Sequence, residues 1–110
     1  MIYRVRARFR ETSAREFHRK LTDGTIAGQE PDGQEMVDSM HRAVVSNAGN
    51  IEWSEVCYCP TPLAHERQTV LDHYFDDITT EPIESYETYP GQPFLDYLSE
   101  LADRPATSQR

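Results

Sequence analysis

Two cysteines on either side of Tyr58, Cys57 and Cys59, are the residues whose type and spacing most directly suggest chemistry. In a regular strand their side chains share one face, with Cα atoms about 6.6 Å apart. A disulfide at that separation needs local distortion of the strand. The pair therefore predicts two small residues in a reduced core, with a soft-metal site or a redox pair as alternatives. Because specific zinc motifs separate their cysteines by two to four residues and add a second ligand pair, we expect no bound metal or other cofactor.

Cys59 is also the best candidate nucleophile in the chain. Thr61 and Pro62 predict a helix that begins just after it, and the positive end of a helix dipole favours a thiolate. His41 and His65 are the candidate groups for proton transfer, because histidine changes its charge near neutral pH. These three residues form the candidate catalytic set.

The helix predicted after Cys59 carries an acidic outer face. Asp72, His73 and Asp76 have spacings that place two cation ligands on one side of a helix. His65 and His73 are eight residues apart, about 80° around a helix, so their rings do not converge. A solvated acidic face is therefore the expected role of these residues.

A row of arginines alternates with apolar residues at the start of the chain: Arg4, Arg6, Arg8 and Arg10 interleave with Tyr3, Val5, Ala7 and Phe9. A period of two predicts a strand with one basic and one apolar face. The expected neighbouring strand contains Trp53 and Glu55, which join Arg4, Arg6 and Arg8 as candidate ligand-binding residues. The row allows three interpretations: pairing with glutamates across the sheet, a homodimer interface, or a pocket for an anionic small molecule.

The chain has 110 residues and a formal net charge of −8, divided into +1 for residues 1–50 and −9 for residues 51–110. This acidity argues against nucleic-acid binding. The apolar runs are too short to span a membrane, and the first residues lack the apolar core of a secretory signal. We therefore expect a cytoplasmic protein without a membrane partner. The common phosphate-loop, dinucleotide, serine-hydrolase and zinc-protease motifs do not occur in the sequence.

Hydrophobic periodicity predicts the elements that must position these residues. We expect a strand over 2–10, a helix from a capping box of Ser13 and Glu16, a strand over 51–59, a helix over 61–75 and a last helix from Pro93.

Two segments are ambiguous. Residues 36–46 fit both a helical stripe and a strand face, and the hairpin loop at 46–50 favours the strand. Residues 78–85 contain Pro82, which favours an edge strand over a helix that begins near Glu81.

The resulting order predicts one α+β domain over residues 1–103, followed by a tail over 104–110. The order is that of the ferredoxin-like βαββαβ sandwich, a four-stranded antiparallel sheet with helices on one face, plus a C-terminal helix. The segments 20–26, 31–33 and 57–67 resemble small bacterial proteins that share this element order. The resemblance implies the fold and brings no reaction or site residues with it.

The function we expect is a small non-enzymatic binding or regulatory domain, homodimeric through the open sheet face. One alternative is a small α+β barrel-type enzyme acting on an anionic small molecule, with Arg4, Arg6 and Arg8 as anion binders and His41 or His65 in proton transfer. A second is a thiol or metal protein that uses Cys57 and Cys59. Trp53 and Cys57 share one face of the predicted strand 51–59. If that face is the arginine face, the two residues can contribute to a site there. If it lies under the helices, they belong to the core.

Overall fold

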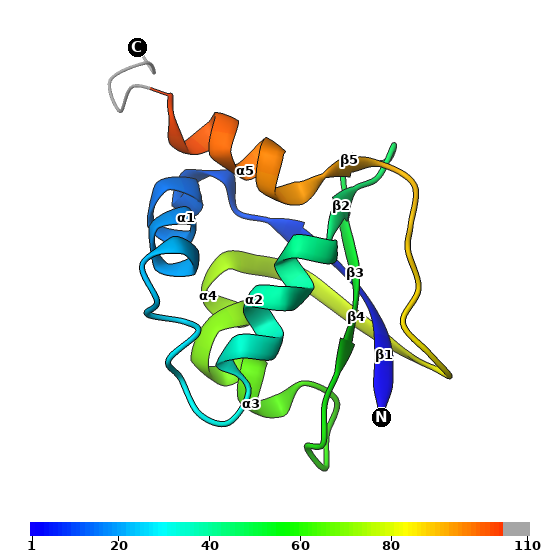
Figure 1. Cartoon of the computed structure of the whole chain (residues 1–110). Coiled ribbons are helices and arrows are strands. Elements are labelled where there is room, and N and C mark those ends of the chain that lie inside the picture. Colours follow the sequence, from blue (N-terminus) through cyan, green and yellow to red (C-terminus); the bar gives the residue numbers. More distant parts are fainter. Residues whose placement is uncertain (105–110) are drawn as a thin grey trace.

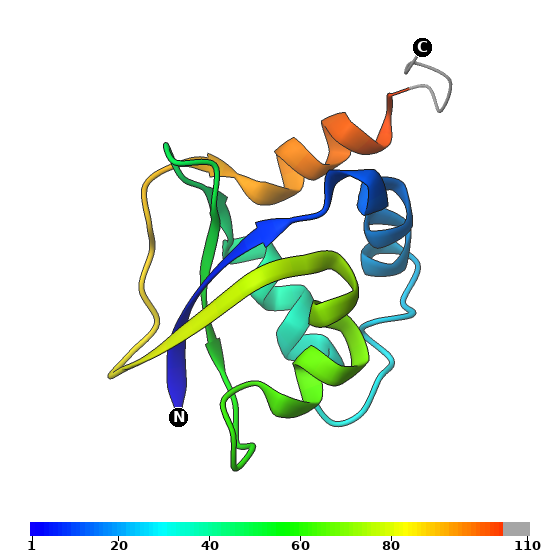
Figure 2. The same cartoon turned by 180° about the vertical axis from the view of Figure 1, so that it is seen from behind.

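The computed structural model describes residues 1–104, which form an α+β arrangement around one open antiparallel sheet. The strands are β1 (Ile2–Phe9), β2 (Val44–Val45), β3 (Ile51–Val56), β4 (Phe75–Ile83) and β5 (Gln92–Pro93), in the order β4-β1-β3-β2-β5. The helical elements are η1 (Glu11–Ser13), α1 (Ala14–Thr22), α2 (Gly33–Arg42), α3 (Ala64–Glu66), the π-helix η2 (Arg67–Leu71), α4 (Asp72–Tyr74) and α5 (Phe94–Ala102). The helices α1 to α4 lie on one side of the sheet, and the chain between β4 and β5 runs along the other (Figures 1 and 2).

The α+β class and the antiparallel sheet are confirmed. The sheet has five strands instead of four, because residues 92–93 pair with β2 as an additional edge strand. The ferredoxin-like assignment is not confirmed. The expected tail falls almost wholly on residues 105–110, which lie outside the described part of the chain. No helix within residues 1–104 combines the length and apolarity needed to cross a bilayer.

The strand predicted over residues 36–46 is wrong, because most of this segment forms helix α2 and only Val44–Val45 form a strand. Met36 and Met40 are each only 1% exposed, and Val37 is also buried. These residues make one helical stripe, and burying two methionines outweighs the alternating pattern that favoured a strand.

The helix predicted over residues 61–75 is shorter and less regular than expected. It begins after Leu63, which is fully buried with φ of 57°, and contains the π-helix η2. Phe75 is already the first residue of β4 and lies opposite Phe9. The edge strand over 78–85 is therefore confirmed up to Ile83, and the alternative helix near Glu81 is wrong.

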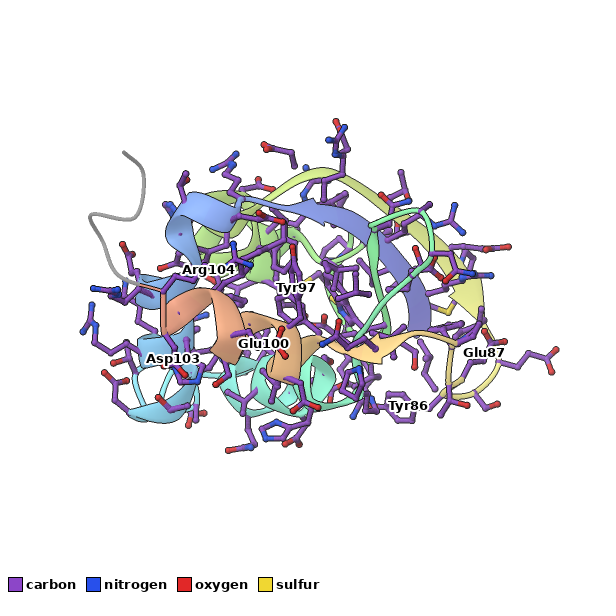
Figure 3. All side chains as sticks on the ribbon, turned by 90° about the horizontal axis from the view of Figure 1, so that it is seen from above. Tyr86, Glu87, Tyr97, Glu100, Asp103 and Arg104 are labelled. Carbon is purple, nitrogen blue, oxygen red and sulfur yellow. The ribbon has the colours of Figure 1, made fainter. Side chains whose placement is uncertain are left out.

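The core lies between the sheet and the helices and is rich in aromatic rings. Phe17 stacks on Tyr74 with 4.6 Å between ring centroids and meets Phe75 edge to face at 5.7 Å. Helix α5, which carries Tyr97, closes the end of this core (Figure 3). The Tyr97 hydroxyl donates a hydrogen bond to Glu11. Glu16, expected to cap α1, instead accepts a hydrogen bond from the Tyr74 hydroxyl at 2.6 Å.

The sheet face away from the helices is partly covered by residues 84–91, the covering segment. The Ser54 hydroxyl hydrogen-bonds the backbone oxygen and nitrogen of Glu87 at 3.1 and 3.2 Å. The Tyr89 ring lies 4.7 Å from the guanidinium of Arg4. Figure 3 shows Tyr86 and Glu87 on this segment, at the opposite end of the molecule from Arg104. The face expected to be open therefore carries the protein's own chain.

Candidate thiol and carboxylate site

The register of the central strands separates the candidate ligand-binding residues onto two faces. Tyr3 lies opposite Glu55 and Val5 opposite Trp53, whereas Arg4 lies opposite Ser54. Because side chains at directly opposed positions share a face, Trp53 and Glu55 belong to the helix-covered face. Both are fully buried there. The structure therefore does not bring them together with Arg4, Arg6 and Arg8, and Cys57 is buried in the core region as well.

The arginine row takes part in cross-strand pairing. Glu52 accepts a hydrogen bond from Arg4 at 2.9 Å and lies 3.5 Å from Arg6 through its second oxygen. Arg8 is exposed, and Arg10 pairs with Asp76 at 2.7 Å. Arg10 and Asp76 are exposed, so their pair contributes little to stability, whereas Glu52 is buried beside its two arginines. These contacts match the first interpretation of the row and lend no support to a homodimer or an anionic ligand.

The other titratable candidates are dispersed. His41 is exposed at the end of α2, where its Nδ1 lies 2.9 Å from the Val37 carbonyl oxygen. Asp72 pairs with Arg67 at 3.0 Å, and Asp76 pairs with Arg10. Asp72 and Asp76, the two carboxylates that the sequence analysis considered as cation ligands, are therefore both paired with arginines.

The cysteines meet a third residue, Glu66, which sequence reasoning did not select as a ligand. The sulfur atoms of Cys57 and Cys59 lie 3.5 and 3.6 Å from the same carboxylate oxygen of Glu66. The three donor atoms all lie within 4.8 Å of one another. We call these three residues the thiol–carboxylate cluster. The signal for Glu66 was its place near the start of the helix predicted over residues 61–75, seven residues after Cys59.

The chain between β3 and α3 folds so that both cysteines face this helix. Residues 57–63 leave the strand through Pro60 and Pro62, and Leu63 adopts the left-handed conformation before α3 begins. The turn directs the backbone N–H of Cys59 to the Cys57 sulfur at 3.2 Å. A backbone N–H aimed at sulfur favours the thiolate form. A buried, strained residue next to a cluster of potential ligands is a common feature of functional sites.

Cys57 and Glu66 of the cluster are buried, and Cys59 is half-buried. Burial raises the pKa of the Cys57 thiol to about 12, although the backbone N–H of Cys59 opposes this effect. Glu66 is 1% exposed, and its side-chain hydrogen bonds within residues 1–104 come from the two thiols. A buried carboxylate that has only thiol donors is poorly compensated.

Glu55 is fully buried and close enough to the cluster for Glu66 to act on its pKa. Trp53 donates a hydrogen bond from Nε1 to one oxygen of Glu55 at 2.8 Å, and the other buried oxygen has no partner among residues 1–104. Burial raises the pKa of Glu55 well above its ordinary value, and the neighbouring carboxylates Glu66, Glu35 and Asp32 raise it further. Glu55 therefore keeps its proton to a higher pH than an ordinary glutamate does, because burial and the nearby carboxylates disfavour its charged form.

A cavity of about 260 Å³ adjoins the cluster. Its walls include His65 and Asp32, whose Nδ1 and carboxylate oxygen are 2.7 Å apart. Glu35 lies on another wall, where it accepts hydrogen bonds from the Val56 backbone and from Arg42 at 2.9 and 3.0 Å. Of the expected catalytic residues, Cys59 and His65 thus share one cavity, whereas His41 lies elsewhere.

Two sulfur atoms and one carboxylate oxygen at these distances are suited to holding a soft cation, and the cavity gives small molecules access to it. Comparison of the chain with protein-family models, with curated proteins and with solved structures finds no match.

Proposed function

We propose that this chain is a metal-binding protein and that Cys57, Cys59 and Glu66 hold a thiophilic divalent cation of the zinc type. The observation that carries the proposal is the pair of distances from the two sulfurs to the Glu66 oxygen, 3.5 and 3.6 Å. Zinc bonds to sulfur at about 2.3 Å and to carboxylate oxygen at about 2.0–2.2 Å, so a tetrahedral site separates these atoms by about 3.5–3.7 Å. The ligands therefore need little movement to accept the ion.

Electrostatics support the same assignment. A cation at the cluster replaces the thiol protons and compensates the buried Glu66 carboxylate, whose partners within residues 1–104 are otherwise the thiols alone. The N–H of Cys59 at 3.2 Å from the Cys57 sulfur supplies the outer hydrogen bond that metal thiolates commonly accept. Because the pKa of Cys57 is about 12, metal binding must release protons, and affinity falls as the pH is lowered.

The raised pKa of Cys57 disfavours a nucleophilic or redox role for that thiol, since both need a low pKa. Metal binding corresponds to the second alternative drawn from the sequence, a thiol or metal protein that uses Cys57 and Cys59. It departs from the expected homodimeric binding domain and from the expectation that no metal is bound. The ligand site moves from the arginine face to the helix-covered side of the sheet, where Cys57 and Glu66 are buried.

The test is the stoichiometry and affinity of zinc in the full chain, measured by competition with a chromophoric chelator. We expect one ion per chain. Cys57→Ser, Cys59→Ser and Glu66→Gln should each weaken binding by about tenfold or more. Glu84→Gln is the matched control, because Glu84 is an exposed glutamate outside the cluster.

Cobalt substitution provides an independent readout. Thiolate ligation should give an intense charge-transfer band in the near ultraviolet that is lost in the double variant Cys57→Ser/Cys59→Ser. Absence of zinc binding by the reduced native chain would refute the proposal, as would cluster variants that bind as tightly as the Glu84→Gln control.

A further inference from the structure

The cluster supplies three protein ligands, one fewer than a closed tetrahedral site contains. Within residues 1–104, no fourth histidine, cysteine or acidic donor atom lies within 4.8 Å of all three cluster donors. His65, the nearest candidate in sequence, is instead held by Asp32 at 2.7 Å. Zinc sites with three protein ligands keep their fourth position for water or for an external ligand.

Building on the proposed metal site, we infer that the fourth coordination position opens into the adjoining cavity and takes the unprotonated nitrogen atom of a small uncharged molecule, such as imidazole or an amine. The cavity of about 260 Å³ is bordered by all three cluster residues, so a molecule inside it reaches the ion. Its volume is slightly below the range of about 300–1,000 Å³ usual for small-molecule pockets, which limits the ligand to roughly one ring.

The charge of the cavity selects against anions. Two thiolates and a carboxylate leave the cluster with one net negative charge after a divalent cation binds. Asp32 and Glu35 add carboxylates to the wall, whereas no lysine or arginine among residues 1–104 borders the cavity. Arg42, which pairs with Glu35 at 3.0 Å, lies outside the lining. Like charges repel more strongly in such a partly buried site than in water, so an anionic ligand is disfavoured.

The remaining wall suits a flat organic molecule. Pro31 and Val56 contribute apolar surface, and Tyr58 contributes an aromatic side chain beside the two cysteines. Tyr58 is 86% exposed, so its ring is accessible to a molecule at the mouth of the cavity. Aromatic rings stack on flat heterocycles and attract cations through their faces. This wall and the carboxylates favour the same class, a nitrogen heterocycle or amine without negative charge that coordinates through an unprotonated nitrogen.

The experiment titrates the cobalt-loaded full chain with imidazole and with azide near neutral pH, following the visible d–d bands. We expect imidazole to shift the bands at millimolar concentration. Azide should bind at least about tenfold more weakly than imidazole. Asp32→Asn should reduce the ratio of imidazole affinity to azide affinity by at least about threefold. Asp38→Asn is the control, because Asp38 is exposed on α2, which begins directly after Asp32, and bonds only Gln34 among the described side chains.

The outcomes separate the two proposals. If cobalt does not bind at all, the metal site itself fails and this inference fails with it. If cobalt binds with thiolate charge-transfer bands but imidazole leaves the spectrum unchanged at tens of millimolar, the site is closed and only this inference is overturned. Azide binding as tightly as imidazole, or equal selectivity in Asp32→Asn and Asp38→Asn, overturns the charge selectivity.

Discussion

Replacing Gly33 with alanine tests whether the turn that places Asp32 and begins α2 needs a residue without a side chain. A Cβ at this position would lie 2.0 Å from the backbone oxygen of Ile26 and 3.1 Å from that of Ala27. Ordinary contacts begin near 3.4 Å, so backbone must move by more than an ångström. Overpacking of this kind costs about 1–3 kcal/mol, and rigid backbone on both sides places Gly33→Ala at the upper end. Alanine's better helix propensity offsets up to about 1 kcal/mol.

The expected net effect is a loss of about 2 kcal/mol in the free energy of unfolding, or about 8 °C in Tm. Urea unfolding followed by fluorescence measures it well, because Trp53 is the single tryptophan and is fully buried. Gly28→Ala in the same loop is the control, since its nearest atom is the Gly24 oxygen at 3.1 Å. If the free energy of unfolding of Gly33→Ala is within about 0.5 kcal/mol of that of Gly28→Ala, the close approach of the Ile26 backbone does not constrain the turn.

Two further predictions follow from the pKa values. In metal-free protein, Glu55 keeps its proton in the folded state at a pH where the unfolded chain has lost it, because its folded pKa is raised. Stability should therefore fall as pH rises above about 4.5, by up to about 1.4 kcal/mol per pH unit. Glu55→Gln should remove this slope in urea titrations, and an unchanged slope would show that Glu55 is not its source. For Cys57, a pKa of about 12 predicts alkylation near pH 8 at least a hundredfold slower than for an ordinary thiol, measured by iodoacetamide labelling of Cys59→Ser. Fast labelling would contradict the protonated, buried thiol.

The parts of the fold that depend on local pattern could be predicted from the sequence. The arginine row specified β1 with its two faces, and Pro82 placed β4 at the edge of the sheet. Residues 36–46 were assigned wrongly to a strand, because their pattern fitted both a helical and a strand period and the adjacent hairpin loop favoured the strand. Met36 and Met40 are buried against other elements, and this burial stabilises the helix. Contacts between distant elements are not visible in a local sequence pattern.

The candidate site was predictable only in part, for a similar reason. The cysteines were evident, but their partner Glu66 depends on how residues 57–63 turn, including the left-handed Leu63. Pattern analysis disfavours that conformation for a branched residue, so it gave no warning of the turn. The pairing of His65 with Asp32 joins positions 33 residues apart, and spacing along one helix does not reveal it.

The π-helix η2 makes chain length matter in this part of the protein. Glu66 precedes the wide turn and faces the thiols, while Tyr74 follows it and packs on Phe17. A helical residue turns the chain by about 100°, so deleting one position within Arg67–Leu71 would rotate one end of the segment relative to the other by about that angle. After such a deletion, the segment can place Glu66 against the thiols or Tyr74 against Phe17, but not both. The outer positions of this segment should accept many substitutions, but insertion or loss of a single residue separates its two buried ends.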